Sequence, residues 1–147
     1  MMGHIIGGRH SHLDNAGYSL DQKTFNKLLP PSEAILKLAI EEEWRNVLNS
    51  LIICLFARSI YTTSLVVECL QNLGIQRTEE ELRSLGVEIQ KIRIKTKKSF
   101  GFNYKDLQQS FPKRLYEMPT GHGLLNEQQM VKLYDSYLEL LDERYLS

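Results

Sequence analysis

The chain has 147 residues, the size of one domain with a hydrophobic core of ordinary proportions. Hydrophobic residues make up 42% and charged residues 24%, which excludes an intrinsically disordered chain. The 18 basic and 18 acidic residues balance to a net charge of zero, which predicts no general affinity for nucleic acid or an anionic membrane, because both need a basic excess.

Cysteine count and apolar runs set the expected environment. Two cysteines provide no disulfide framework, so we expect a reducing, cytoplasmic setting. Residues 1–10 lack the charged and apolar regions of a signal peptide. The longest apolar run, residues 51–57, is far shorter than the roughly 20 residues that a membrane span needs. We therefore predict a soluble protein.

Residues 1–31 are rich in Gly, His and Asn and show little periodicity, which predicts an irregular segment with a short helical turn near residues 23–28. The segment closes on two prolines, which cannot continue a helix. Ser32 is then expected to cap a helix whose apolar residues recur at three- and four-residue steps to about Arg58, with a break around residues 49–50. An acidic run at residues 41–43 is expected on the opposite, polar face.

Two further helices follow. Thr62 or Thr63 caps a segment that ends at Gly74, a glycine at the position just past the helix end. Thr78 and Glu81 form a capping box that opens the next helix. Its apolar residues continue to Ile94, and its C-terminal end, residues 91–98, is basic, which suits the helix dipole.

Residues 99–125 look irregular, and Asn126 starts a last amphipathic helix. No alternating strand pattern of useful length occurs. The predicted fold class is therefore all-α: an irregular N-terminal segment, residues 1–31, followed by an orthogonal or bundle-like array of about five helices, residues 32–147.

The histidines near the start of the chain and the two cysteines are the residues whose side chains are most suited to metal binding. His10 and His12 could share a metal, but no cysteine or further histidine lies near them in the sequence, so a loop without metal is favoured. Cys69 falls on the apolar face of its helix, which predicts a core residue. Cys54, in its apolar run, is by itself also typical of core packing, because an iron–sulfur cluster usually needs four thiolates.

Three stretches in a fixed order carry a family resemblance: LNSLIICLFA (48–57), TEEELRSLGVEIQKIRI (78–94) and SFGFNYKDLQQSFPKRLYEMP (99–119). They resemble the all-helical C-terminal part of the tungsten-containing aldehyde ferredoxin oxidoreductase family. There, the first is a segment in which Asp, two residues, Gly, one residue and Cys precede an apolar-aromatic pair. The second is similar to its EEL…GERIWNLER helix, and the third to its Gly-Phe, Asp, Pro-x-Arg, Glu-Pro loop. The closing helix, with Tyr134 and Tyr137, is similar to its LDEYYEL helix.

The resemblance implies roles for four residues. In the family, the cysteine of the first stretch is the fourth ligand of a [4Fe–4S] cluster, which implies that Cys54 is a metal ligand. The family residues before this cysteine approach a tungsten bis-pterin, which implies that Asn49 and Ile53 bind the cofactor. Asn49 stands where the family has Asp, so only an amide oxygen would accept pterin N–H bonds. Ile52 stands where the family has Gly and adds a β-branched side chain. His12 matches a histidine that assists proton transfer near the tungsten.

The resemblance also implies an enzyme that is incomplete without a partner. The chain lacks the family's pterin-binding sheet domain and the CxxCxxxC segment with the other three cluster cysteines, so we expect a missing half or subunit to supply them. Only that assembly would oxidise an aldehyde and reduce ferredoxin. Apolar surface near Cys54 would otherwise favour homo-oligomers. The alternative is a non-catalytic helical interaction module, or a truncated remnant, that kept the fold.

Overall fold

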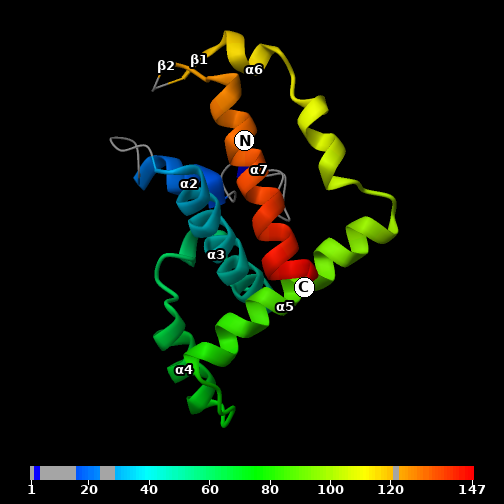
Figure 1. The fold of residues 1–147 in the computed structure, drawn as a ribbon. Coiled ribbons are helices and arrows are strands. Elements are labelled where there is room, and N and C mark those ends of the chain that lie inside the picture. Colours follow the sequence, from blue (N-terminus) through cyan, green and yellow to red (C-terminus); the bar gives the residue numbers. More distant parts are fainter. Residues whose placement is uncertain (1, 4–15, 24–28, 121–122) are drawn as a thin grey trace.

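The computed structural model describes residues 2–3, 16–23, 29–120 and 123–147, and it confirms the all-α class (Figure 1). The helices are α2 (Ala16–Lys23), α3 (Pro31–Ser50), α4 (Thr63–Asn72), α5 (Glu79–Ser99), α6 (Arg114–Glu117) and α7 (Glu127–Leu140), which continues into the π-helical turn η3 (Leu141–Leu146). Two 3₁₀ segments, η1 (Leu55–Ala57) and η2 (Tyr104–Ser110), and a two-residue antiparallel pair, β1 (Pro119–Thr120) with β2 (Gly123–Leu124), complete the described elements.

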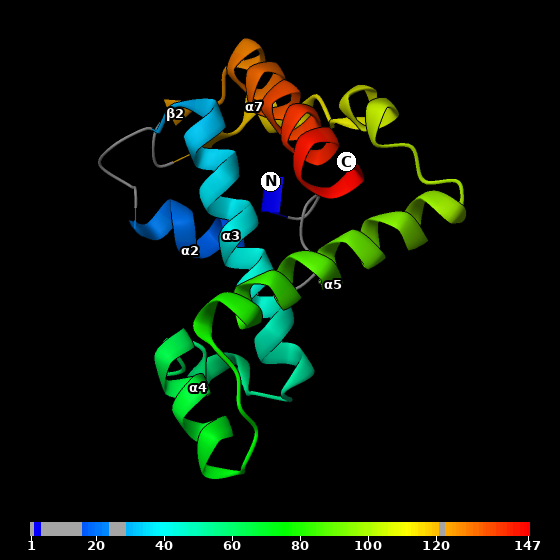
Figure 2. The same cartoon turned by 60° about the horizontal axis from the view of Figure 1, so that its bottom comes forward.

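Helix α3 is the centre of the fold, because α2, α5 and α7 all pack against it (Figure 2). Its N-terminal half contributes to the larger hydrophobic core together with α2, α5, η2, α7 and η3. The buried members from α3, α5, α7 and η3 are Ile35, Leu38, Ala39, Ile94, Met130, Tyr134, Tyr137, Leu141 and Tyr145. Its C-terminal half supplies Leu48 to a smaller core with Val66 of α4 and Leu82 of α5. The two cores divide the molecule into a large upper part and a small part around α4. None of the described helices combines the length and apolar character that crossing a lipid bilayer requires.

Local signals at most helix ends act as predicted. Thr62 caps α4 and Thr78 forms the capping box of α5, while the Asn126 side chain accepts two backbone N–H bonds at the start of α7. The prediction for Ser32 is wrong. Helix α3 begins at Pro31, because a proline fits the first helical position, where its missing N–H would have no intrahelical partner.

The N-terminal segment is more ordered than predicted. Helix α2 falls within residues 1–31, and its Ala16 is fully buried and donates its N–H to Glu42 Oε1 at 3.1 Å. The irregular prediction is therefore wrong for residues 16–23. The helical turn predicted near residues 23–28 lies, beyond Lys23, outside the described residues.

The acidic run of α3 is not the solvated face that the sequence predicts. Glu43 is 5% exposed, and Arg144 of η3 donates two hydrogen bonds to its carboxylate, from Nε to Oε1 (2.6 Å) and from Nη2 to Oε2 (2.8 Å). The buried Tyr145 hydroxyl donates a third bond to Oε1 at 2.6 Å. These bonds raise the pKa of Arg144, so the guanidinium stays charged. The prediction failed because the partners lie about 100 residues away in the sequence.

Helix α5 crosses α3 on a face with a four-residue repeat: Leu82, Gly86, Gln90 and Ile94 are buried. Leu85 and Ile92, large apolar residues of the same helix, are 46% and 62% exposed. Gln90 instead accepts a hydrogen bond from Asn46 Nδ2 of α3 (3.0 Å). A small and a polar residue thus form the centre of this contact, which apolar periodicity does not reveal.

Candidate functional site

The segment that contains Cys54 begins where α3 ends, at Ser50, so the continuous helix to about Arg58 does not form and the expected break does. The Ile52 N–H donates to Asn49 O (2.9 Å) and the Ile53 N–H to Leu48 O (3.0 Å). This pair of bonds is the Schellman motif, in which the residue just past the helix end adopts the left-handed conformation. Here that residue is Ile52, with φ 59°.

Ile52 differs from the residues that end the neighbouring helices. Helices α4 and α5 close with the same hydrogen-bond pattern, but their left-handed positions hold Gly74 (φ 78°) and Gly101 (φ 82°). Glycine has no Cβ to clash there, whereas a left-handed β-branched residue is strained. Ile52 is 92% exposed, so its side chain gains little burial in compensation.

The turn at Ile52 sets the directions of the next two side chains. Ile53 is half-buried and packs on the small core that contains Leu48, the contact that accompanies a Schellman motif. Cys54 follows with an exposed side chain and accepts the Ala57 N–H through its backbone oxygen (2.9 Å), which starts η1. The interpretation of Cys54 as core filler is therefore wrong. Cys69 on α4 is also exposed, which overturns its assignment to the core.

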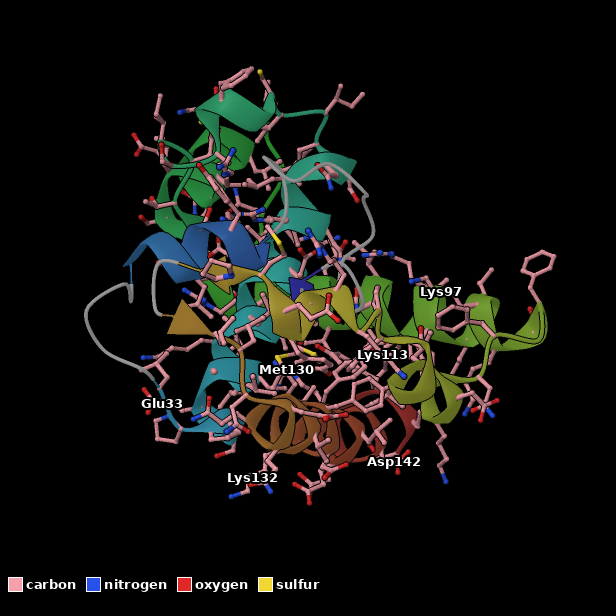
Figure 3. All side chains as sticks on the ribbon, turned by 90° about the horizontal axis from the view of Figure 1, so that it is seen from above. Glu33, Lys97, Lys113, Met130, Lys132 and Asp142 are labelled. Carbon is pink, nitrogen blue, oxygen red and sulfur yellow. The ribbon has the colours of Figure 1, made fainter. Side chains whose placement is uncertain are left out.

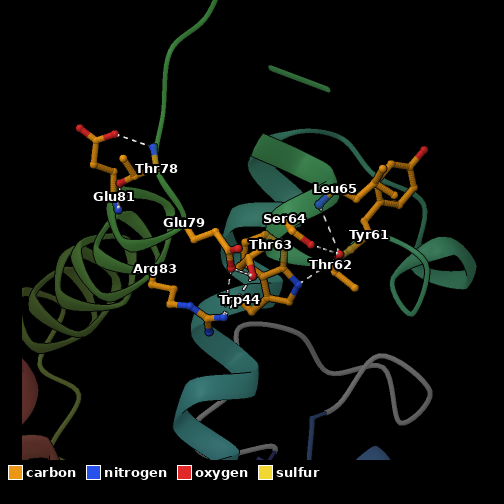
Figure 4. Close-up of polar contacts among 10 residues, drawn as sticks. All are labelled: Trp44, Tyr61, Thr62, Thr63, Ser64, Leu65, Thr78, Glu79, Glu81 and Arg83. Carbon is orange, nitrogen blue, oxygen red and sulfur yellow. Dashed lines mark hydrogen bonds and ion pairs between the residues drawn. The ribbon is translucent and has the colours of Figure 1, made fainter. Parts of the chain in front are cut away.

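The far end of the loop is fixed by polar contacts (Figure 4). The Trp44 indole of α3 donates to the Tyr61 carbonyl at 3.3 Å. On α4, the Thr63 hydroxyl donates to Glu79 Oε2 (2.5 Å) and accepts from Arg83 Nη2 (3.1 Å), both on α5. Residues 51–60 are thus held at both ends, by the α3 terminus and by these bonds.

A cavity of about 350 Å³ lies beside this loop, between α2, α3 and η1. Its lining combines aromatic, aliphatic and charged side chains: Ser19, Glu41, Trp44, Arg45, Leu48, Phe56, Arg58 and Ser59. Arg45 is only 2% exposed and bonds Ser19 Oγ (2.9 Å) and Glu41 Oε1 (3.1 Å) through Nη2. The sequence did not single out Arg45 or Arg58; the one signal for Arg58 is its place four residues after Cys54.

Of the predicted site residues, the structure groups three. Asn49, Ile53 and Cys54 lie on one turn, with Asn49 exposed on the last helical turn of α3. Within the described part of the chain, the Asn49 side chain makes no hydrogen bond, so its amide is accessible to a ligand. His12 and its neighbour His10 lie outside the described residues.

Comparison with known proteins adds the family. The family model described as aldehyde ferredoxin oxidoreductase, domains 2 and 3, matches residues 4–146. The chain belongs to this family. Searches of curated proteins and of solved structures found no match. The match covers both cores and the Cys54 loop, and it describes the C-terminal domains of an oxidoreductase that also has a first domain.

Aldehyde ferredoxin oxidoreductases generally bind an iron–sulfur cluster and a tungsten or molybdenum pterin. The described residues contain no group of three or more His, Cys, Asp or Glu side chains able to hold a metal. The exposed thiol of Cys54 could fill a single position of a cluster only if other chains or segments supplied the remaining ligands. For the pterin, the last turn of α3 offers one accessible amide, that of Asn49.

We expect Ile52→Gly to raise the free energy of unfolding by up to about 1 kcal/mol, because it removes left-handed strain of about 1–2 kcal/mol and adds less unfolded-state entropy than that. Urea unfolding of both chains measures the difference. Leu51→Gly is the matched control: its φ is −86°, so glycine should destabilise there by roughly 0.5–1 kcal/mol. Equal losses at both positions would show that Ile52 is unstrained.

Proposed function

We propose that Cys54 provides one thiolate ligand to a [4Fe–4S] cluster in an aldehyde ferredoxin oxidoreductase assembly. The observation that carries the proposal is the exposed thiol on a loop that the Ile52 turn directs outward and that contacts at both ends hold in place. When bound, the cluster would pass to ferredoxin the electrons that the aldehyde gives up on oxidation. A partner half or subunit with a CxxCxxxC segment supplies the other three ligands.

The residues around Cys54 divide the remaining work. Ile53 holds the loop to the small core and so fixes the Cys54 backbone. The Asn49 amide oxygen would accept a hydrogen bond from a bound pterin, in place of the carboxylate of the family. The cavity beside the loop, with Trp44 and Arg58 in its lining, is part of the pocket around the cofactor or substrate. His12 assists proton movement at the substrate.

The two exposed cysteines allow a matched test. The chain is mixed with a candidate partner half and reconstituted with iron and sulfide. Cluster formation is measured by the charge-transfer absorption at about 400 nm and by the electron paramagnetic resonance of the reduced cluster. Cys54→Ser is expected to lower the absorption or shift the resonance and reduction potential. Cys69→Ser, which removes the other exposed thiol, is expected to change neither. A cluster that is identical with and without Cys54 rules out the ligand role.

A second function, a non-catalytic helical interaction module, has its own support. Asn49 and Ile52 depart from the family pattern, which has Asp and Gly there, at two positions of the segment that the resemblance assigns to the cofactors. This function predicts that the wild-type chain binds the partner half, as measured by sedimentation velocity, while the complex gains no iron beyond that of the partner alone. Iron gained with Cys54, and lost in Cys54→Ser, contradicts it.

A further inference from the structure

The net charge of zero conceals a strongly basic segment. Residues 89–105, which form the second half of α5, the turn after it and the start of η2, contain six lysines and arginines and no acidic residue. The rest of the chain therefore carries a balancing acidic excess. In Figures 1, 2 and 3 the end of α5 and this turn lie at the outer edge of the molecule, away from the other helices. We call residues 89–105 the basic arm.

Half of the basic side chains of the arm are occupied within the protein. Arg93 Nη1 donates to Asn46 Oδ1 on α3 at 2.7 Å, and Lys91 pairs with Glu88 at 3.6 Å. Lys97 lies 5.5 Å from the Phe102 ring centre, and desolvation followed by the nearby Arg93 lowers its pKa.

The other three, Lys95, Lys98 and Lys105, are exposed and form no ion pair within the described part of the chain. Large apolar side chains of the same segment are also exposed. Phe100 is 86% exposed, and Ile92, which lies on the same face of α5 as Lys95, is 62% exposed. The Schellman turn at Gly101, with Phe102 N–H bonded to Lys97 O (3.1 Å), fixes the backbone that presents Phe100.

We propose that the basic arm docks on an anionic lipid surface, with Lys95, Lys98 and Lys105 against the headgroups and Phe100 inserted at the boundary with the acyl chains. Exposed lysines beside an exposed phenylalanine match the two attractions that hold peripheral segments at such surfaces, the charge of the headgroups and burial of apolar area. This binding is independent of the Cys54 proposal.

Two features favour lipid over other anionic partners. Five of the six basic residues are lysines, a residue that protein interfaces tend to exclude, whereas membranes attract lysine and arginine alike. The C-terminal end of α5 and the turn after it also lie at the outer edge of the molecule, whereas single-stranded nucleic acid is usually bound in a groove that follows its backbone. An edge that carries charge together with exposed apolar side chains suits a flat surface.

Sedimentation of the full chain with vesicles tests the proposal. With phosphatidylcholine vesicles that contain about 30 mol% phosphatidylserine, the bound fraction should exceed that on pure phosphatidylcholine at least about threefold, and about 0.5 M salt should abolish the excess. The triple variant Lys95→Gln, Lys98→Gln, Lys105→Gln should lose the excess. The matched control, with three exposed lysines elsewhere replaced (Lys37→Gln, Lys113→Gln, Lys132→Gln), should keep it.

Phe100→Ser separates insertion from charge. It should weaken vesicle binding about threefold or more without changing its salt dependence. Leu73→Ser, at another highly exposed apolar site on the α4 end, should have no effect. No excess on anionic vesicles, or an equal loss in the control variants, overturns the proposal. Tighter binding to an oligothymidylate or to polyglutamate than to the vesicles also overturns it, in favour of a nucleic-acid or an acidic-protein partner.

Discussion

Arg144→Met is expected to lower the free energy of unfolding by about 2–4 kcal/mol. Breaking a buried ion pair leaves a charge without its partner, which costs about 3–5 kcal/mol when both groups are buried. The Glu43 side chain is 6% exposed and that of Arg144 is 35% exposed, so the expected loss extends below that range. Methionine keeps the aliphatic stem in place, which restricts the change to the charge and its bonds. Urea unfolding at neutral pH measures the loss.

Two further variants show whether the loss comes from an orphaned carboxylate. Glu43→Leu together with Arg144→Met removes both charges, and the double variant should recover most of the stability that the single variant loses. Tyr145→Phe removes the third bond to Glu43 and should cost about 1.5–3 kcal/mol. Tyr137→Phe is its control, because the buried Tyr137 hydroxyl has no hydrogen-bond partner in the described structure. Removal of the Tyr137 hydroxyl should leave the free energy of unfolding unchanged or raise it. Additive losses in the double variant would refute the orphaned-charge explanation.

The starts of α4, α5 and α7 and the end of α4 could be predicted because their causes are local. Thr78 and Glu81 of the capping box are three residues apart, and Gly74 meets a backbone requirement that its own helix sets. Burial at the centre of the fold could not be predicted, because it depends on contacts between residues that are far apart in the sequence. Glu43 reads as part of a solvated acidic run until η3 places Arg144 beside it.

The candidate site was predictable to the extent that family resemblance aligned it. The resemblance placed Asn49, Ile52 and Cys54 on one segment, and periodicity alone would have buried Cys54 in a longer α3. The helix ends because Leu48 and Asn49 carbonyls accept the N–H groups of the Schellman turn. That turn normally shows itself in a sequence as glycine, and isoleucine at its left-handed position conceals it.

Gly86 is the residue whose replacement should most directly disturb the packing of α5 on α3. A Cβ built there would lie 2.6 Å from the Glu43 carbonyl oxygen and 2.9 Å from its carbonyl carbon. Both atoms belong to the α3 backbone, so no side-chain rotation relieves the clash and the helices must separate. Gly86→Ala is therefore expected to lower the free energy of unfolding by about 2 kcal/mol, overpacking outweighing the roughly 1 kcal/mol gain in helix propensity.

Ser84→Ala is the matched control on the same helix, because Ser84 is exposed and alanine there should only improve helix propensity, by up to about 0.5 kcal/mol. Far-ultraviolet circular dichroism should show unchanged helix content in both variants, since the expected loss at Gly86 is one of packing. The same separation would move Glu43 away from Arg144 and Tyr145. The double variant Gly86→Ala, Arg144→Met should therefore lose less unfolding free energy than the sum of the losses in the two single variants. Stabilisation by Gly86→Ala, as at Ser84, would show that α3 and α5 pack less closely than described.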